Sequence, residues 1–167
     1  MNNINKNNAV ISLGTNLGDK EENLKKAILM LEIDSQVLKK SKIYTTEPWG
    51  YKSVNNFLNM GLLIATDYNS SNLLKHIKEI ENTMGRKLNK QNGYMDRVID
   101  LDILLFNSEE VTSDELTIPH PRIVERKFSI VILQDIFEEK KIPVLNKKAI
   151  TLLNNCKDNS KITIFEN

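Results

Sequence analysis

The stretch RVIDLDILLF, residues 97–106, constrains the fold most because it combines the apolar pattern of a buried strand with two carboxylates. Side chains alternate between the faces of a strand, so Asp100 and Asp102 share one face with Leu104 and Phe106, and the Cα atoms of the acids are roughly 6.5–7 Å apart. The opposite face carries Ile99, Leu101, Ile103 and Leu105. Buried carboxylates are costly unless they are paired or metal-bound, so this end of the strand needs water or a cation.

The chain before this strand begins with a strand pattern followed by a helix pattern. Residues 9–13 (AVISL) predict a short buried strand that ends at Gly14. Asp19 and Glu22 then form a candidate capping box, and apolar residues at helical spacing predict a helix over about residues 20–33. A strand followed by a helix is therefore expected first.

Two further strands and a second helix are predicted in the middle of the chain. Residues 37–45 and 57–66 have strand patterns and are joined by the loop TEPWGYKSVNN, which is long for a hairpin and therefore a candidate functional loop. Ser70 or Ser71 is a candidate cap for the helix that follows, and Gly85 is a candidate stop.

The predicted order up to residue 106 is therefore β-α-β-β-α-β. This order is typical of an α+β, ferredoxin-like fold, in which both helices cover one face of an antiparallel sheet. A C-terminal helical extension follows, with helices expected near residues 125–138 and 147–155 and a last strand at 161–165.

The composition indicates one ordinary globular domain. The 167 residues are 40% hydrophobic and 27% charged, with no apolar run of membrane-spanning length. Residues 1–8 are polar and are expected to form a frayed tail rather than an export signal, which leaves residues 9–167 as a single domain. We expect a monomer that does not bind a membrane.

Net charge and cysteine usage restrict the partners and the compartment. Lys and Arg total 23 against 22 Asp and Glu, so no strong field predicts nucleic acid as a partner. Cys156 is the only cysteine, which excludes an internal disulfide and a thiolate metal cluster and fits a reducing cytoplasm.

The acidic pair has two interpretations. Carboxylates without neighbouring His or Cys suit Mg²⁺, which takes one or two of them together with phosphate oxygens, but such a pair is also found on a solvated strand face. The basic residues Arg86, Lys87, Lys90 and Arg97 lie close in the sequence and are suited to phosphate, or to surface salt bridges.

Other candidates remain equally open. His120 lies between two prolines in TIPHPRI and is either aimed at a ligand or part of the turn. Glu81 is either a ligand contact or a partner of Arg86. Asn59, inside an apolar strand, binds either a polar heterocycle or neighbouring backbone. Three aromatic residues are suited either to stacking on a flat ring or to the core: Trp49, Phe57 and Phe128.

Seven motifs in order resemble the 6-hydroxymethyl-7,8-dihydropterin pyrophosphokinase family over about residues 9–135. They are SLGTNLGD, YTTEPWG, FLNMGL, the helix ending in Glu81 with Gly85-Arg86, RVIDLDILLF, TIPHPRI, and ERKF at 125–128. The resemblance implies a ferredoxin-like fold, transfer of pyrophosphate from ATP to the pterin hydroxymethyl oxygen in folate biosynthesis, and release of AMP.

The resemblance also implies three groups of site residues. The group that acts on the transferring phosphates is Arg86, Arg97, Asp100 and Asp102, with the two acids as ligands of two Mg²⁺ ions. The group that binds the pterin is Thr46, Glu47, Trp49, Phe57, Asn59 and Phe128. The group that binds ATP is Glu81, Ile103, Thr117, His120 and Arg126.

The chain departs from the family pattern before the acidic pair. The family often has Arg-Trp-Gly-Pro-Arg there, whereas this chain has GYMDR at residues 93–97, so Tyr94 stands in for the tryptophan. Leu88 replaces an arginine of some members and Lys78 a glutamine, which bears on ATP affinity and loop closure.

Two rival functions remain compatible with the residues alone. A palm-type nucleotidyltransferase or cyclase also places acids and two metals on a ferredoxin-like sheet, but it releases pyrophosphate. A non-catalytic ferredoxin-like binding module is the second rival, although the chain lacks a basic, aromatic pair of RNA-reading strands.

Overall fold

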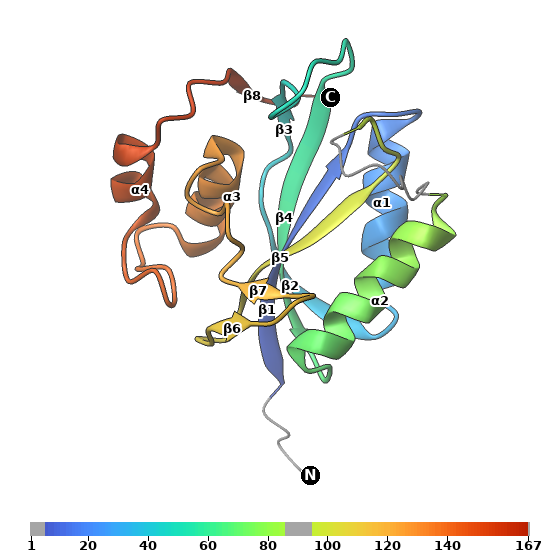
Figure 1. Cartoon of the computed structure of the whole chain (residues 1–167). Coiled ribbons are helices and arrows are strands. Elements are labelled where there is room, and N and C mark those ends of the chain that lie inside the picture. The colour runs from blue at the N-terminus through green and yellow to red at the C-terminus, as the bar shows by residue number, and fades with distance from the viewer. Residues whose placement is uncertain (1–5, 86–94, 167) are drawn as a thin grey trace.

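A computed structural model describes residues 6–85 and 95–166, and an antiparallel sheet runs through its centre (Figure 1). In chain order the elements are β1 Asn7–Thr15, α1 Lys20–Leu31, β2 Ser35–Lys40, β3 Tyr44–Thr46, β4 Phe57–Thr66, α2 Ser70–Thr83, β5 Asp100–Phe106, β6 Val111–Thr112, β7 Thr117–Ile118, α3 Lys127–Phe137, α4 Ala149–Asn155 and β8 Ile162–Ile164. β1 takes its first two residues from the segment 1–8 that we expected to be a tail.

The sheet has the ferredoxin-like topology that the sequence predicts. Its strand order is β5-β1-β4-β3-β8, β2 also pairs with β4, and every pair is antiparallel. Because α1 connects β1 to β2 and α2 connects β4 to β5, the two β-α-β units interleave, which places β1 and β4 at the centre.

The strand expected at residues 37–45 is two strands, β2 and β3, so that expectation was wrong in detail. The break lies at Ser41, whose backbone N–H donates to Gly61 O at 2.9 Å while its hydroxyl accepts from Gly61 N at 2.8 Å. A side-chain oxygen thus replaces a backbone partner, and the pairing with β4 continues past the break.

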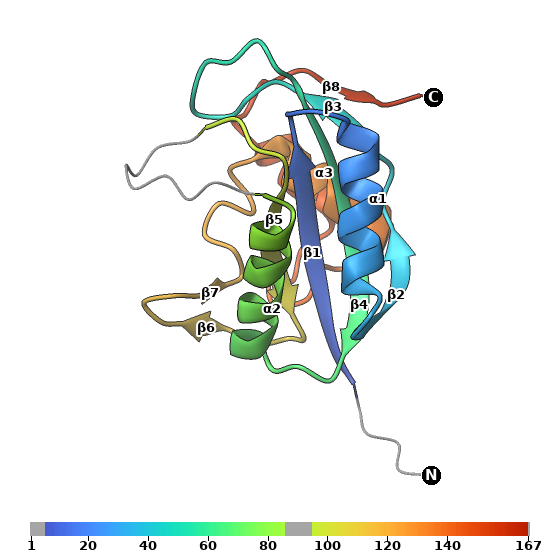
Figure 2. The same cartoon turned by 90° about the vertical axis from the view of Figure 1, so that its right-hand side faces the viewer.

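Helices α1 and α2 lie side by side over one face of the sheet (Figure 2). Asp19 caps α1 as predicted, accepting a bond from Glu22 N. α2 is capped by Asn69, whose side chain accepts from Asn72 N at 2.9 Å, so the prediction of Ser70 or Ser71 was wrong. The backbone is still extended at Asn69 and is helical from Ser70, so only Asn69 has the geometry of a cap.

A β-bulge in the pairing of β1 with β5 interrupts the alternation predicted for residues 97–106. Val10 pairs with Leu105 but Ile11 pairs with Ile103, so Leu104 is the extra residue. Leu104 keeps its predicted face and packs into the core on the α3 side. Leu105 packs on that side too, and Phe106 packs under α1 and α2, so the faces predicted for Leu105 and Phe106 were wrong. Asp100 and Asp102 precede the bulge and keep the face that was predicted for them.

The C-terminal extension covers part of the second face. α3 approaches β4 closely at Gly61, where a Cβ atom would overlap Ile132 Cγ2, and α4 packs against α3. The strand β8 then pairs with β3 at the sheet edge, so the elements predicted after residue 106 are confirmed. None of the helices in the described part of the chain is long and apolar enough to cross a membrane.

Candidate active site

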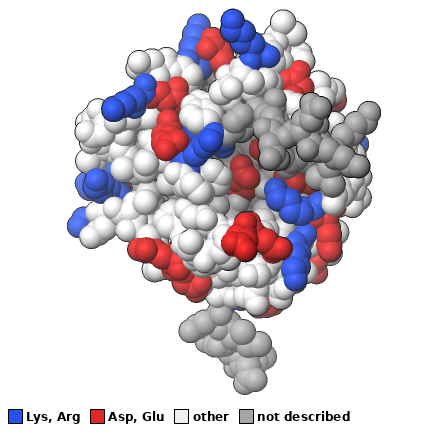
Figure 3. Space-filling view, in the orientation of Figure 1, with Lys and Arg blue, Asp and Glu red and all other residues white. Residues whose placement is uncertain are grey.

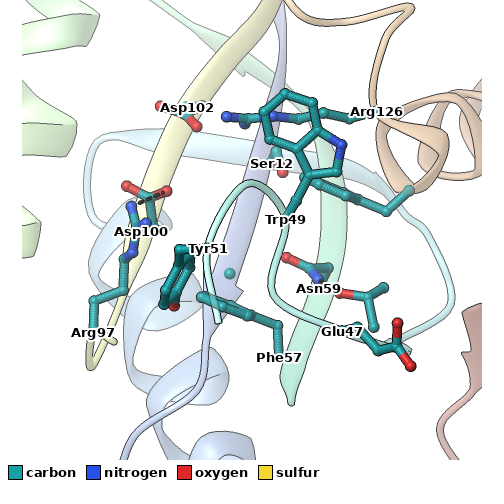
Figure 4. Close-up of a pocket in the computed structure, with 13 residues that line it drawn as sticks. Ser12, Glu47, Trp49, Tyr51, Phe57, Asn59, Arg97, Asp100, Asp102 and Arg126 are labelled. Atoms are coloured by element: carbon teal, nitrogen blue, oxygen red, sulfur yellow. Dashed lines mark hydrogen bonds and ion pairs between the residues drawn. The ribbon is translucent and has the colours of Figure 1, made fainter. Parts of the chain in front are cut away.

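A pocket opens on the α3 side of the sheet, beside the region that α3 covers (Figure 4). It holds about 500 Å³ of space that is partly open to solvent. The predicted site residues that line it are Thr46, Glu47, Trp49, Phe57, Asn59, Arg97, Asp100, Asp102, Arg126 and Phe128. Residues that are far apart in the sequence therefore meet in one cavity.

The floor of the pocket consists of neighbouring strands held in register. β1 lies between β5 and β4, so Gly14 has Asp100 on one side and Asn59 on the other. A Cβ atom at Gly14 would lie 2.8 Å from Asn59 Oδ1, so glycine is needed for the amide to take this position. Asn59 Nδ2 donates to the hydroxyl of Thr46 at 2.7 Å, which leaves its carbonyl oxygen directed towards Gly14.

The acidic pair lies along β5, on the opposite side of the pocket from Asn59 and Glu47 (Figure 4). Asp100 Oδ2 accepts from Arg97 Nη1 at 2.8 Å. Burial raises the pKa of the Asp102 carboxyl and the charge of Asp100 raises it further, whereas His120, Lys78 and Arg126 oppose the shift. Two carboxylates crowded together under partial burial favour a bound cation.

The residues present fit a magnesium site that is completed by a ligand. Within residues 6–85 and 95–166, no group of three or more His, Cys, Asp or Glu side chains is arranged to hold a metal ion. Among the described residues, Asp100 and Asp102 line the pocket and would offer two carboxylates with hard oxygen donors. Mg²⁺ is commonly held in this way, by one or two carboxylates, waters and substrate phosphates.

Cationic and aromatic groups pack together at the pocket, and Figure 4 shows the Arg126 guanidinium beside Asp102. Arg126 Cζ lies 4.9 Å from the centre of the Trp49 ring and 5.9 Å from that of Phe128, and Arg122 Cζ lies 5.0 Å from the Trp49 ring. Acidic and basic side chains are interspersed over this face of the molecule (Figure 3). Attraction for an anionic substrate therefore depends on local cations such as Arg97 and Arg126.

The sequence matches the family model of 7,8-dihydro-6-hydroxymethylpterin-pyrophosphokinase (HPPK) over residues 10–138. The chain belongs to the HPPK family. The 2-amino-4-hydroxy-6-hydroxymethyldihydropteridine pyrophosphokinase of Bacillus subtilis is 42% identical over 141 residues, which are 83% of this chain and 81% of the relative. The protein of the same name from Porphyromonas gingivalis is 38% identical over 129 residues, 75% of this chain and 88% of the relative.

Solved structures agree on the fold. A chain of HPPK-DHPS, crystallised in complex with substrates, superposes with a TM-score of 0.72 at 17% identity. The match covers 90% of this chain but only 43% of that chain, so this chain spans less than half of the HPPK-DHPS protein. At such low identity the likeness concerns the ferredoxin-like fold alone.

Some residues expected from the HPPK resemblance do not line the pocket. His120 lies close enough to Asp102 for that carboxylate to act on its pKa. Burial lowers the pKa of His120, and Asp102 opposes this shift in part. The Nδ1 atom of His120 accepts a hydrogen bond from Arg122 N at 3.1 Å. Thr117 is in β7, three residues before His120, and does not line the pocket. The ATP contacts proposed for His120 and Thr117 stay predictions.

Glu81 and Ile103 lie towards the face that α1 and α2 cover. Glu81 accepts a 2.6 Å bond from the backbone N–H of Leu101 and a 3.1 Å bond from Lys78 Nζ, so its carboxylate ties α2 to β5. Ile103 is buried in the core between the sheet and these helices. Their ATP contacts stay predictions, as does the role of Arg86, which lies outside the described residues with Lys87, Leu88, Lys90 and Tyr94.

The sequence did not point to every residue in and around this pocket. Ser12, Gly14 and Tyr51 also line the pocket, and strand alternation on β1 was the available signal for Ser12. Asp96 was missed altogether, although it stands where the family often has proline. Its carboxylate accepts four hydrogen bonds, from Asn16 Nδ2 at 2.7 Å, Tyr51 OH at 3.0 Å, Ser53 Oγ at 2.9 Å and Asn55 Nδ2 at 2.7 Å.

Proposed function

We propose that this chain transfers the pyrophosphoryl group of ATP to the hydroxymethyl oxygen of 6-hydroxymethyl-7,8-dihydropterin, giving the pterin diphosphate and AMP in folate biosynthesis. The observation that carries the proposal is the shared pocket. Asp100, Asp102 and Arg97 line one side and Asn59 and Phe57 line the other. The pocket therefore has one end suited to phosphate and one end suited to a polar aromatic ring.

The phosphate end is suited to displacement at phosphorus. Asp100 and Asp102 would hold Mg²⁺, for which we propose two ions. Bound with ATP, Mg²⁺ at these carboxylates would supply neutralisation of phosphate charge and would lower the pKa of the attacking hydroxyl. The guanidinium groups of Arg97 and Arg126 bind phosphate oxygens and stabilise the charge that develops on the transferring group. Such a reaction depends on position and charge rather than on a protein nucleophile.

The pterin end supplies polar recognition and flat apolar surfaces. Asn59 is 5% exposed and held by Thr46, so its amide presents a fixed acceptor to a heterocycle edge. Phe57 and Phe128 line the same cavity and offer rings for stacking. Backbone groups of Thr46, Glu47 and Trp49 complete the edge recognition in this proposal.

The proposal extends to the assembly and location of the protein. We propose that the protein is a monomer. We also propose a cytoplasmic location, because the chain contains a single cysteine, Cys156, and cannot form an internal disulfide.

One reaction tests this function against its rivals. The purified protein is incubated with ATP, Mg²⁺ and 6-hydroxymethyl-7,8-dihydropterin, and the nucleotide and pterin products are separated. AMP and the pterin diphosphate in equal amounts are expected. Pyrophosphate release would instead indicate a nucleotidyltransferase or cyclase, and unchanged substrates would indicate a binding module; either result overturns the proposal.

A further inference from the structure

A cluster of hydrogen bonds around Asp96 lies behind one wall of the pocket. Its four donors are the side chains of Asn16, Tyr51, Ser53 and Asn55, and two of them approach each carboxylate oxygen. The bonds are 2.7–3.0 Å long, which is typical of strong bonds to an ionised acceptor. All four bonds come from side chains, so the position of the Asp96 carboxylate depends on its neighbours in the folded chain.

The cluster joins three separate parts of the chain. Asn16 directly follows β1, and Tyr51, Ser53 and Asn55 belong to the loop of residues 47–56 between β3 and β4. Asp96 itself lies just before β5. The loop and the entrance to β5 have no strand pairing with each other, so side chains must hold them together.

The cluster is connected directly to Arg97. The side-chain oxygen of Asn16 accepts from Arg97 N at 2.7 Å, and Asn16 N donates to Arg97 O at 3.1 Å. Both backbone polar groups of Arg97 are thus bonded to Asn16, which is 3% exposed and is itself held by Asp96. Arg97 then extends its side chain to Asp100 in the pocket.

The same cluster holds the 47–56 loop, which carries three pocket residues: Glu47, Trp49 and Tyr51. Tyr51 lines the pocket and donates its hydroxyl to Asp96, and Trp49 lies two residues before it in the same loop. Burial raises the pKa of Tyr51 to about 12 and the Asp96 carboxylate contributes to the shift, so this hydroxyl stays protonated as a donor at neutral pH.

We propose that Asp96 is a positioning residue that fixes Arg97 for the transferring phosphates and fixes the 47–56 loop for the pterin. The inference rests on the proposed function and assigns a role to an acid that replaces the family's usual proline. Asp96 is not among the residues that line the pocket. It acts through Asn16 on the arginine and through Tyr51, Ser53 and Asn55 on the loop.

Replacement of Asp96 by Asn is the direct test because it keeps the size and removes the charge. An ionised aspartate only accepts hydrogen bonds, whereas an asparagine places an NH₂ group at one of the two oxygen positions. That NH₂ group would face a donor such as Asn55 Nδ2 or Asn16 Nδ2, so part of the cluster must open. Asp114→Asn is the matched control, since Asp114 is an exposed aspartate in the turn between β6 and β7.

The first measurement is independent of activity. Trp49 is the only tryptophan of the chain, so its fluorescence reports on the 47–56 loop alone. Acrylamide should quench Trp49 more strongly in Asp96→Asn than in the wild type, and Asp114→Asn should match the wild type. Unchanged quenching in Asp96→Asn would show that Asp96 does not hold the loop, even if the chain proved to have another activity.

The second measurement is a double-mutant cycle on kcat with Arg97→Ala. In the wild-type background Asp96→Asn should lower kcat by about 10- to 100-fold, the scale for misplacing a catalytic group. In the Arg97→Ala background, Asp96→Asn should lower kcat by less than about threefold, because the effects of residues that act together are not additive. Equal losses in both backgrounds, or no loss in the first, would overturn the proposal.

A milder variant keeps the test valid if Asp96→Asn does not fold. Ser53→Ala removes one donor from the cluster and no group from the pocket lining. Ser53→Ala should increase the quenching of Trp49 and the KM for the pterin, each by less than Asp96→Asn does. If the wild type transfers no pyrophosphate, the proposed function fails while the quenching experiment still decides whether Asp96 holds the loop.

Discussion

Arg97 and Asp100 form an ion pair in which Nη1 lies 2.8 Å from Oδ2, with the two side chains 14% and 20% exposed. The pair places a guanidinium beside a carboxylate that we propose as a metal ligand. Arg97 Cζ also lies 5.9 Å from the centre of the Phe57 ring, so the cation extends between the phosphate end and the pterin end. In the proposed reaction, negative charge would develop on the transferring group close to this guanidinium.

Replacing Arg97 with Ala should lower kcat by about 10²–10³, the usual cost of removing a donor that stabilises transition-state charge. The KM for ATP should change less, because this interaction strengthens as the phosphoryl group moves. Steady-state kinetics of AMP formation measure both constants. Arg97→Lys is the matched control and should recover part of the loss, since it keeps the charge but not the planar fork. A change confined to KM would make Arg97 a ground-state binder.

Replacing Asp102 with Asn should abolish turnover without lowering the melting temperature. Burial and Asp100 raise the pKa of Asp102, so its charged form is disfavoured in the folded protein and a neutral amide relieves that cost. Thermal unfolding with and without Mg²⁺ and a non-hydrolysable ATP analogue measures the effect, and the stabilisation by Mg²⁺ should be lost.

Asp100→Asn provides the contrast to Asp102→Asn. It breaks the ion pair with Arg97, so it should abolish turnover and also lower the melting temperature. Near-normal activity in either variant would contradict the proposal that these two residues hold the metal.

The sequence predicted most features of the fold that depend on local signals, with the cap of α2 as the exception. Alternation placed Asp100 and Asp102 on one face, and the Asp19 cap and the Gly85 stop follow from single residues, with φ of +88° at Gly85. The faces of Leu105 and Phe106 were wrong because a bulge depends on how β5 pairs with β1. That register depends on both strands and cannot be predicted from the sequence of β5 alone.

The family resemblance named residues that the structure brings together, but their roles stay predictions. Asn59, Asp100 and Arg126 line the expected cavity, but the Asp96 cluster was not foreseen. Its partners Asn55 and Asn16 are 41 and 80 residues away from it in the chain. Polar loop residues of this kind are common, and only the folded chain shows which of them converge.

Replacing Phe128 with Ala should weaken pterin binding by about tenfold, since an aromatic stacking partner contributes on the order of 1 kcal/mol beyond its buried area. ATP binding should change little, because Phe128 supplies no charge to phosphate. Titration calorimetry with each ligand measures both dissociation constants. Phe128→Leu is the control that keeps apolar volume without the ring. Its affinity for the pterin should lie between that of the wild type and that of Phe128→Ala. Similar losses for both ligands would indicate that the start of α3 has unfolded.

Replacing Gly61 with Ala should destabilise the fold by about 1–3 kcal/mol, the usual cost of overpacking a core. The new methyl group would overlap Ile132 Cγ2, where α3 packs on β4. Urea unfolding measures the free energy of unfolding. Ile132→Ala removes the overlapping carbon, so the double variant should lose less than the sum of the single variants. Strict additivity would mean that the two sites do not touch.

Replacing Asp96 with Asn should make stability less dependent on pH in the acid range. The Asn55 amide lowers the pKa of Asp96 to about 2, with Ser53, Asn16 and Tyr51 acting in the same direction against the opposing effect of burial. A carboxyl whose pKa is depressed in the folded state contributes stability above its unfolded pKa of about 4, and this contribution is lost as the pH falls towards 2.

The wild type should therefore exceed Asp96→Asn in free energy of unfolding by a constant amount from pH 7 to 5, and the difference should narrow between pH 4 and 3. Urea unfolding curves at each pH measure the difference, with Asp114→Asn expected to follow the wild type throughout. Because Asp96 must be ionised to accept all four bonds, a difference that stays constant down to pH 3 would mean that its charge does not hold the cluster together.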